Sequence, residues 1–130
     1  MNADKLQEKE TTEIILKCFY EVYNELGHGF LESIYEKAMC IALKEYGLDV
    51  ETQKEISVSF RGNIIGNFRA DLIVNHSVII ELKAARSIDT MHEAQLLNYL
   101  KATPIEIGLL LNFGKKPEFK RFIFDNSRKK

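Results

Sequence analysis

The chain has 130 residues, of which 45% are hydrophobic and 28% charged, and this is enough apolar material for the core of one ordinary globular domain. Its charges are well mixed and sum to a formal net charge of −1, which argues against a disordered chain and against a strong overall field toward nucleic acid or membrane. A nucleic-acid partner would therefore need a local basic patch.

The N-terminal segment, MNADKLQEKETTE, is charged and lacks the apolar centre of a secretion signal. No apolar run approaches the length of a membrane span. The two cysteines, Cys18 and Cys40, lie in segments with helical periodicity and do not have the spacing of metal ligands. These features favour a cytoplasmic protein with reduced, buried thiols, and they leave a disulfide between the two cysteines as the alternative.

Two helices are expected at the start of the chain. Residues 4–26 have helical periodicity, and the glycines of the Gly27-His28-Gly29 turn end that segment. The second helix is expected from about Leu31 to Tyr46, directly before Gly47. Its apolar stripe is expected to consist of Ile34, Ala38, Ile41 and Ala42.

The rest of the chain is dominated by strand patterns. Alternating or continuous apolar runs predict strands over residues 55–60, 64–74, 78–83, 106–113 and 119–124. Residues 88–102 are predicted to be helical and to end before Thr103-Pro104, and residues 125–130 are expected to be frayed. With no repeat or linker, residues 1–130 are expected to form one domain of the α/β (α+β) class. Its mixed sheet would be flanked by helices in the order ααβββαββ.

Three charged residues interrupt two of these strands. Asp71 lies in the run RADLIV, and Glu81 and Lys83 lie in VIIELK, on either side of the turn at 75–77. A charged group in an apolar strand is costly unless it is paired, solvated or bound to something. Because residues two apart in a strand share a face, Glu81 and Lys83 project together.

The length of the turn decides whether Asp71 joins the other two. A three-residue loop at 75–77 places Asp71 opposite Glu81, so that both carboxylates and the ammonium group meet at one spot. A loop one residue shorter pairs Asp71 with Ile80 and separates the carboxylates. The interpretation without a function is an exposed ion pair between Lys83 and one of the acids, which would contribute little.

Adjacent carboxylates have a chemical consequence that favours a site. They raise each other's pKa unless a cation lies between them, and a divalent ion with a preference for oxygen, such as Mg²⁺ or Mn²⁺, suits that place. A neighbouring lysine can stabilise developing negative charge or orient a water nucleophile. The D-x₉-E-x-K spacing across a predicted hairpin therefore favours metal-assisted phosphodiester hydrolysis over a surface ion pair.

These residues resemble the signature of the PD-(D/E)XK nuclease superfamily, in which an Asp on one strand and an (Asp/Glu)-x-Lys on the next form a metal-dependent active site. RAD and ELK supply the acids and the lysine, and Ala70 stands where the superfamily has its Pro. The resemblance implies a restriction-endonuclease-like fold over about residues 11–125. It implies metal binding and water activation by Asp71, Glu81, the Leu82 carbonyl and Lys83.

Two helical segments extend the resemblance. GFLESIYEKAM contains the Gly29, Glu32 and Tyr35 of the GxxExxY family, a small branch of that superfamily, and QLLNYL matches the Gln-x-x-x-Tyr element of RecB-like nucleases. The resemblance makes Glu32 a candidate third acid at the metal, whereas the plain alternative is an N-terminal cap or a charge complement at a helix start. Gln95 could hydrogen-bond a metal-bound water or a phosphate. Tyr99 could hydrogen-bond Lys83 or a phosphate, or could only pack against the sheet.

Basic residues near the predicted cleft could contact a phosphate backbone with a salt-sensitive affinity that does not depend on sequence. The candidates are Arg69, Arg86, Lys115 and Lys116. The alternative is an ordinary solvated face, which the near-neutral net charge allows equally.

The sequence thus predicts a Mg²⁺- or Mn²⁺-dependent nuclease. Its expected substrate is nucleic acid, with DNA as the first choice, and its expected role is in DNA processing or repair. The alternative is a catalytically weak or inactive module of the same fold that binds nucleic acid or a protein partner. A plain structural domain with surface ion pairs is a third interpretation. A homodimer is left open, since Phe119, Phe122 and Phe124 on the last strand could form a seam or belong to the core.

Overall fold

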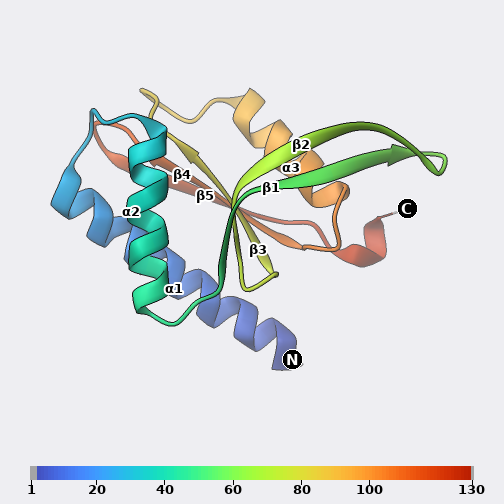
Figure 1. Cartoon of the computed structure of the whole chain (residues 1–130), viewed down its shortest axis with the longest axis horizontal. Helices are drawn as coiled ribbons and strands as arrows, with labels where there is room; N and C mark the ends of the chain where they lie inside the picture. The colour runs from blue at the N-terminus through green and yellow to red at the C-terminus, as the bar shows by residue number, and fades with distance from the viewer. Residues whose placement is uncertain (1–2, 130) are drawn as a thin grey trace.

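The computed structural model describes the backbone of residues 3–129 and the side chains of residues 7–129 (Figure 1). Two helices, α1 and α2, precede three strands, and α3 separates these strands from the last two. The order ααβββαββ confirms the predicted fold class. The elements are α1 (Ala3–Leu26), α2 (Glu32–Glu45), β1 (Val50–Phe60), β2 (Asn63–Val74), β3 (Val78–Lys83), α3 (Thr90–Lys101), β4 (Ile107–Phe113), β5 (Pro117–Ile123) and a 3-10 turn (Asn126–Arg128).

The five strands form one mixed sheet in the order β1-β2-β3-β4-β5. Only β3 and β4 are parallel, because α3 carries the chain from one to the other, and the remaining neighbours are antiparallel. Helices α1 and α2 pack on one face and α3 on the other, so two separate apolar cores lie on either side of the sheet. Every residue of β4 is buried, as expected for a central strand with a continuous apolar run.

The turn between β2 and β3 has three residues. Val74 pairs with Val78, and Asn75 and His76 adopt φ angles of 51° and 55°, a left-handed conformation that Asn and His tolerate better than most side chains. The Ser77 N–H donates to the Val74 carbonyl at 3.0 Å and closes the loop. The predicted three-residue register is therefore confirmed, and the shorter loop is wrong.

The buried stripe of α2 differs from the predicted one by one position. Tyr35, Met39 and Leu43 are buried, whereas Ile34 and Ile41 are 41% and 63% exposed. Tyr35 decides the orientation, since its ring stacks on Phe113 with centroids 4.1 Å apart and its hydroxyl donates to the Gly27 carbonyl at 2.6 Å. A large aromatic ring with a satisfied hydroxyl buries more surface than an isoleucine, so it takes the inward position.

Strand β1 begins five residues earlier than the alternation predicts. Val50 packs in the core beneath α1 and α2, but Ile56, also at an even position, packs in the core beneath α3. Side chains on a regular strand keep to one face at every second position, so the strand must change face between them. Gln53 lies between them with φ 50°, and its left-handed backbone accounts for the change.

The C-terminal tail is held in place through residue 129, unlike the frayed tail that we expected. The Asn126 N–H donates to Glu106 Oε2 at 2.8 Å, and Lys129 Nζ donates to the Thr103 and Ile105 carbonyls at 2.8 and 2.7 Å. These bonds satisfy donors at the chain end that would otherwise depend on water alone.

Both cysteines are free thiols, and Cys18 is buried. Burial raises the pKa of the Cys18 thiol to about 11, so this thiol stays protonated and unreactive at neutral pH. In the part of the chain that the structure describes, none of the helices has the length and apolar character to cross a membrane.

Gly108 on β4 is expected to be sensitive to a single added methyl group. A Cβ atom there would lie 2.9–3.1 Å from three side-chain atoms of Leu96, which is fully buried on α3. We therefore expect Gly108→Ala to lower the free energy of unfolding by about 1–3 kcal/mol, measured by urea denaturation. Gly66→Ala on β2 is the matched control, since its Cβ would meet open space. Equal stability of the two variants would contradict this packing.

Candidate active site

The site forms where β2 and β3 stop pairing. Their backbone ladder runs from Val74↔Val78 to Leu72↔Ile80 and goes no further. Strand β3 nevertheless continues beside β4 as far as Lys83, while β2 continues beside β1 into a long hairpin. Figure 1 shows the outer part of this hairpin extending away from the rest of the sheet. The separation leaves a gap in the sheet that side chains have to fill.

Asp71 and Glu81 fill this gap. The Asp71 N–H donates to Glu81 Oε2 at 3.3 Å, and the Leu82 N–H donates to Asp71 Oδ2 at 2.8 Å. Each carboxyl group thus accepts a backbone N–H that, in a regular ladder, would donate to a backbone carbonyl of the opposite strand. The sequence prediction that Asp71 and Glu81 come together is confirmed, although a side-chain bridge joins them in place of a regular ladder pair.

The surroundings of this pair favour the protonated form of Glu81. Glu81 is only 6% exposed. Its burial, followed by the interaction with the Asp71 carboxyl, raises the pKa of Glu81 to about 9, and the Lys83 ammonium offsets only part of this rise. Lys83 is half-buried at the end of β3 and shares the strand parity of Glu81. Two acids and one lysine are therefore grouped at the gap.

Helix α2 forms one wall of the site. A pocket of about 200 Å³ is lined by Glu32, Ser33, Glu36, Gln53, Asp71 and Leu82. The predicted third acid, Glu32, thus faces the same pocket as Asp71. Its side chain does not cap the helix, because the N-cap residue is Leu31 and no side-chain hydrogen bond is made there. Its place in the first turn still complements the helix dipole.

Three residues of this pocket, Ser33, Glu36 and Gln53, are absent from the sequence prediction. Gln53 Nε2 donates to Glu36 Oε1 at 2.7 Å and to Asp71 Oδ1 at 3.3 Å, so the glutamine joins the two acids. The pairs Thr52↔Leu72 and Lys54↔Ala70 place it directly across from Asp71. A sequence signal existed for Glu36, which lies one helical turn after Glu32 and shares its face. We find no such signal for Gln53.

Helix α3 forms the other wall. The ring of Tyr99 stacks on Phe68 with centroids 3.7 Å apart, and burial, then the charges of Glu81 and Asp71, raise the pKa of its hydroxyl. Tyr99 therefore packs on the hairpin and also lies close to the acids, so its two predicted roles are compatible. Gln95 lines a larger groove of about 720 Å³ between the hairpin and α3, together with Tyr99, and is not among the residues of the 200 Å³ pocket.

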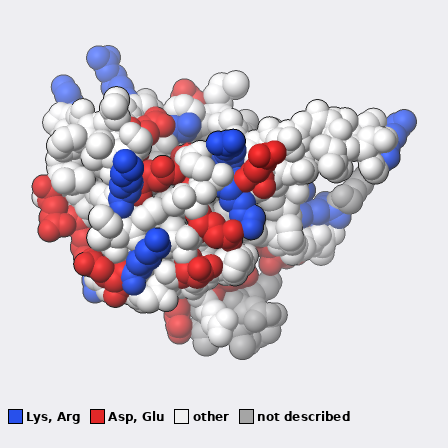
Figure 2. All heavy atoms as spheres, viewed as in Figure 1, with Lys and Arg blue, Asp and Glu red and all other residues white. Residues whose placement is uncertain are grey.

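The predicted basic residues lie in separate places. Arg69 is exposed on the hairpin, where it pairs with Glu55 in the ladder. Arg86 and Lys115 line one pocket beyond the ends of β3 and β4. Lys116 is exposed in the adjoining turn. Figure 2 shows Lys and Arg side chains mixed with acids over the visible face, as the net charge of −1 requires.

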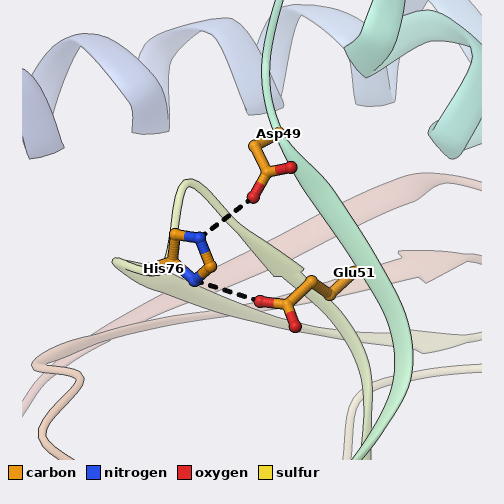
Figure 3. Close-up of side chains that lie close together, drawn as sticks. All are labelled: Asp49, Glu51 and His76. Atoms are coloured by element: carbon orange, nitrogen blue, oxygen red, sulfur yellow. Dashed lines mark ion pairs between the residues drawn. The ribbon is translucent and has the colours of Figure 1, made fainter.

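A second group of possible metal ligands lies at the start of β1 (Figure 3). His76 Nε2 lies 3.2 Å from Asp49 Oδ2, and His76 Nδ1 lies 3.1 Å from Glu51 Oε1. His76 is therefore exposed but paired on both ring nitrogens. Any cation would have to displace these ion pairs, and the ligands are largely open to water, so the group is the weaker of the two candidates.

Comparison with known proteins identifies the family to which this chain belongs. A crystal structure of SSO0001 is similar with a TM-score of 0.56 and 25% identity, and the match covers 72% of this chain and 50% of that one. The alkaline exonuclease LHK-Exo from Laribacter hongkongensis gives a TM-score of 0.44 and 12% identity over 73% of this chain and 57% of that one. This chain thus spans half the length of the first structure and 57% of the second. A comparison with curated proteins gave no significant match. A model of the PD-(D/E)XK nuclease superfamily matches residues 9–122, and the chain therefore belongs to that superfamily.

Proposed function

We propose that this protein hydrolyses phosphodiester bonds of nucleic acid, DNA in the first instance, with the help of Mg²⁺ or Mn²⁺. The observation that carries the proposal is the pair of carboxyl groups, Asp71 and Glu81, held together at the gap with Lys83 two residues further along β3. A cytoplasmic role in DNA processing or repair is part of the proposal. The same proposal includes a partner, either another protein or a second copy of this chain.

The donor set at the gap fits a hard divalent cation. Its available ligands are carboxylate and carbonyl oxygens, which Mg²⁺ and Mn²⁺ prefer. Burial, followed by the interaction with the Asp71 carboxyl, raises the pKa of Glu81, and Lys83 offsets only part of this rise, so a bound cation would favour the ionised form of Glu81. Asp71 and Glu81 would hold the ion, with Glu32 and the Leu82 carbonyl as further ligands. When bound, such an ion polarises the scissile phosphate and lowers the pKa of an attacking water.

The remaining residues have roles of their own in this proposal. The Lys83 side chain lies near Glu81, where it stabilises the extra negative charge of a pentacovalent phosphate or orients the attacking water. Gln95 and Tyr99 donate hydrogen bonds to a phosphate or a bound water from the α3 wall. Arg69 and Lys116 add long-range attraction for the phosphate backbone, so binding is expected to weaken as salt increases.

Membership of the GxxExxY branch is also proposed, and the local geometry supports it. Gly29 has φ 107°, a backbone conformation that favours glycine, and Tyr35 anchors the Gly27 carbonyl. Glu32 lies between them and faces Asp71 across the pocket. Each motif position thus has a physical reason in this chain.

Metal titration and cleavage together test the proposal. Calorimetric titration with Mg²⁺ and Mn²⁺ should show binding by the native protein and none by Asp71→Ala. A mixed panel of single- and double-stranded DNA and RNA should be cut by the native protein and not by Asp71→Ala. Cleavage by purified, folded Asp71→Ala at the native rate would rule out this assignment.

A non-catalytic binding module is the second candidate, and one observation favours it. Both acids already have structural roles as bridges between β2 and β3, since each accepts an N–H from the other strand. A chain that used them only in this way would bind no divalent metal at the gap and would cleave no nucleic acid, and Asp71→Ala would then change stability but leave any metal binding unchanged. The metal titration therefore separates the two candidates.

A further inference from the structure

A basic pocket of about 380 Å³ lies beyond the ends of β3 and β4. Its basic side chains are His28, Arg86 and Lys115, and Gly29 and Gly114 contribute backbone to the lining. The lining contains no acidic side chain. His28, Arg86 and Lys115 are all exposed, so a ligand can reach them. In Figure 1 the loops between α1 and α2, between β3 and α3, and between β4 and β5 lie at the upper left. Figure 2 shows Lys and Arg side chains projecting from that part of the molecule.

The loop that follows β3 is pinned by a buried asparagine. Asn112 is completely buried; its Oδ1 accepts from the Ala85 N–H at 2.9 Å and its Nδ2 donates to the Ala85 carbonyl at 3.0 Å. This two-point contact fixes the backbone directly before Arg86. A fixed backbone reduces the entropy lost when the guanidinium group binds a ligand.

The other two loops are pinned by tyrosines. The Tyr23 hydroxyl lies 2.8 Å from the Gly114 carbonyl oxygen and 2.6 Å from the Lys115 carbonyl oxygen, and it shares its hydrogen bond between them. The Tyr35 hydroxyl donates to the Gly27 carbonyl at 2.6 Å and accepts from the Phe30 N–H at 3.3 Å, on either side of His28. Three loops from distant parts of the chain are thus each tied to the core beside a basic side chain.

The pinned loops also touch one another. A Cβ atom on Gly114 would lie 2.6 Å from the Ala85 carbonyl oxygen, so only glycine allows this approach. The contact brings the loop of Lys115 against the loop of Arg86. The basic pocket is therefore formed in advance by the fold.

We infer that this basic pocket binds a phosphate group of the nucleic-acid strand held at the acid pair. The identity of the ligand as nucleic acid rests on the proposed function. The Cα atoms of Lys83 and Arg86 are at most about 11 Å apart, and a strand of B-DNA rises about 3.4 Å per nucleotide. The pocket thus lies within a few nucleotides of the scissile position. Arginine and lysine in a pocket of fixed geometry are typical ligands of phosphate oxygens.

The bound phosphate could be a 5′-terminal monophosphate or an internal phosphodiester, because both present the same anionic oxygens. Three single-stranded DNA probes of equal length separate these sources: a linear strand with a 5′-phosphate, the same strand with a 5′-hydroxyl, and a closed circle. Binding is measured by fluorescence anisotropy in EDTA, so that neither metal nor cleavage is needed. The test variant is Arg86→Ala combined with Lys115→Ala.

The matched control is Lys37→Ala combined with Lys44→Ala. It removes the same charge from exposed positions of α2 that do not line the basic pocket. Thermal unfolding of all proteins checks that each is folded.

We expect the pocket variant to bind at least about tenfold more weakly than the control, since one lost charge-assisted hydrogen bond corresponds to about that factor. A loss confined to the 5′-phosphorylated strand identifies a terminal phosphate, and an equal loss on all three probes identifies an internal one. Affinities equal to those of the control on every probe, or no binding by the native protein, would overturn the inference. If binding is lost as expected but the native protein cleaves nothing, the basic pocket stands and the proposed catalysis fails.

Discussion

Lys83→Ala is expected to lower the rate of metal-dependent cleavage by about 10²–10³-fold, the usual cost of removing one group that stabilises transition-state charge. The expected effect on metal binding is small and favourable, because the ammonium group is not a ligand and repels a cation. The effect on the fold is also small, since Lys83 is the last residue of β3 and only half-buried. The variant should therefore separate chemistry from metal binding, which Asp71→Ala cannot do.

Single-turnover cleavage on one nucleic-acid substrate, together with calorimetric metal titration, checks this expectation. Lys44→Ala is the matched control, since it removes one exposed lysine from the last turn of α2, away from the residues that line the site pocket. Lys83→Arg should recover only part of the rate, because a planar guanidinium keeps the charge but not the compact geometry of the ammonium group. A full cleavage rate in Lys83→Ala would remove the lysine from the chemistry.

The centre of the site could be predicted because it depends on local rules. Strand parity placed Glu81 with Lys83, and the odd number of residues in the turn at 75–77 placed Asp71 opposite them. Both rules act over short distances along the chain. The structure adds the reason for the charges: the two carboxyl groups close a gap where the backbones of β2 and β3 separate.

The wall on the α2 side could not be predicted in the same way. Gln53 reaches Asp71 only because its left-handed backbone turns β1 from one face of the sheet to the other. An alternating pattern cannot show such a change, and the same change hid the first five residues of β1. The orientation of α2 was missed by one residue, because the stacking of Tyr35 on Phe113 outweighed the isoleucines. Contacts between distant segments decided both cases.

Glu81→Gln is expected to stabilise the metal-free protein at pH 8 relative to the native protein. Glu81 has a pKa of about 9 in the folded chain, against an ordinary value of 4.5. Between these values the folded state binds one proton more than the unfolded state, so the free energy of unfolding falls as pH rises. Each pH unit in this window removes about 1.4 kcal/mol. The contribution is complete below pH 4.5 and is lost as pH rises toward 9.

Urea denaturation in EDTA from pH 5 to pH 9 measures this difference. The native protein should lose a few kcal/mol more than Glu81→Gln over the range. Glu118→Gln, which neutralises an exposed carboxyl on β5, should follow the native protein. A gap between native and Glu81→Gln that does not change with pH would contradict the assigned protonation.

The same experiment with metal connects stability to function. A divalent ion that binds only the folded state at 100 times its dissociation constant should stabilise the native protein by about 2.7 kcal/mol. This gain should grow with pH, because the ion competes with the proton on Glu81, and it should largely vanish in Glu81→Gln. If Mg²⁺ and Mn²⁺ stabilise both proteins equally, the ion is bound elsewhere, and the group of Asp49, Glu51 and His76 becomes the place to examine. The two acids at the gap would then be structural bridges, since a buried carboxyl that meets neither metal nor solvent is most stable with its proton.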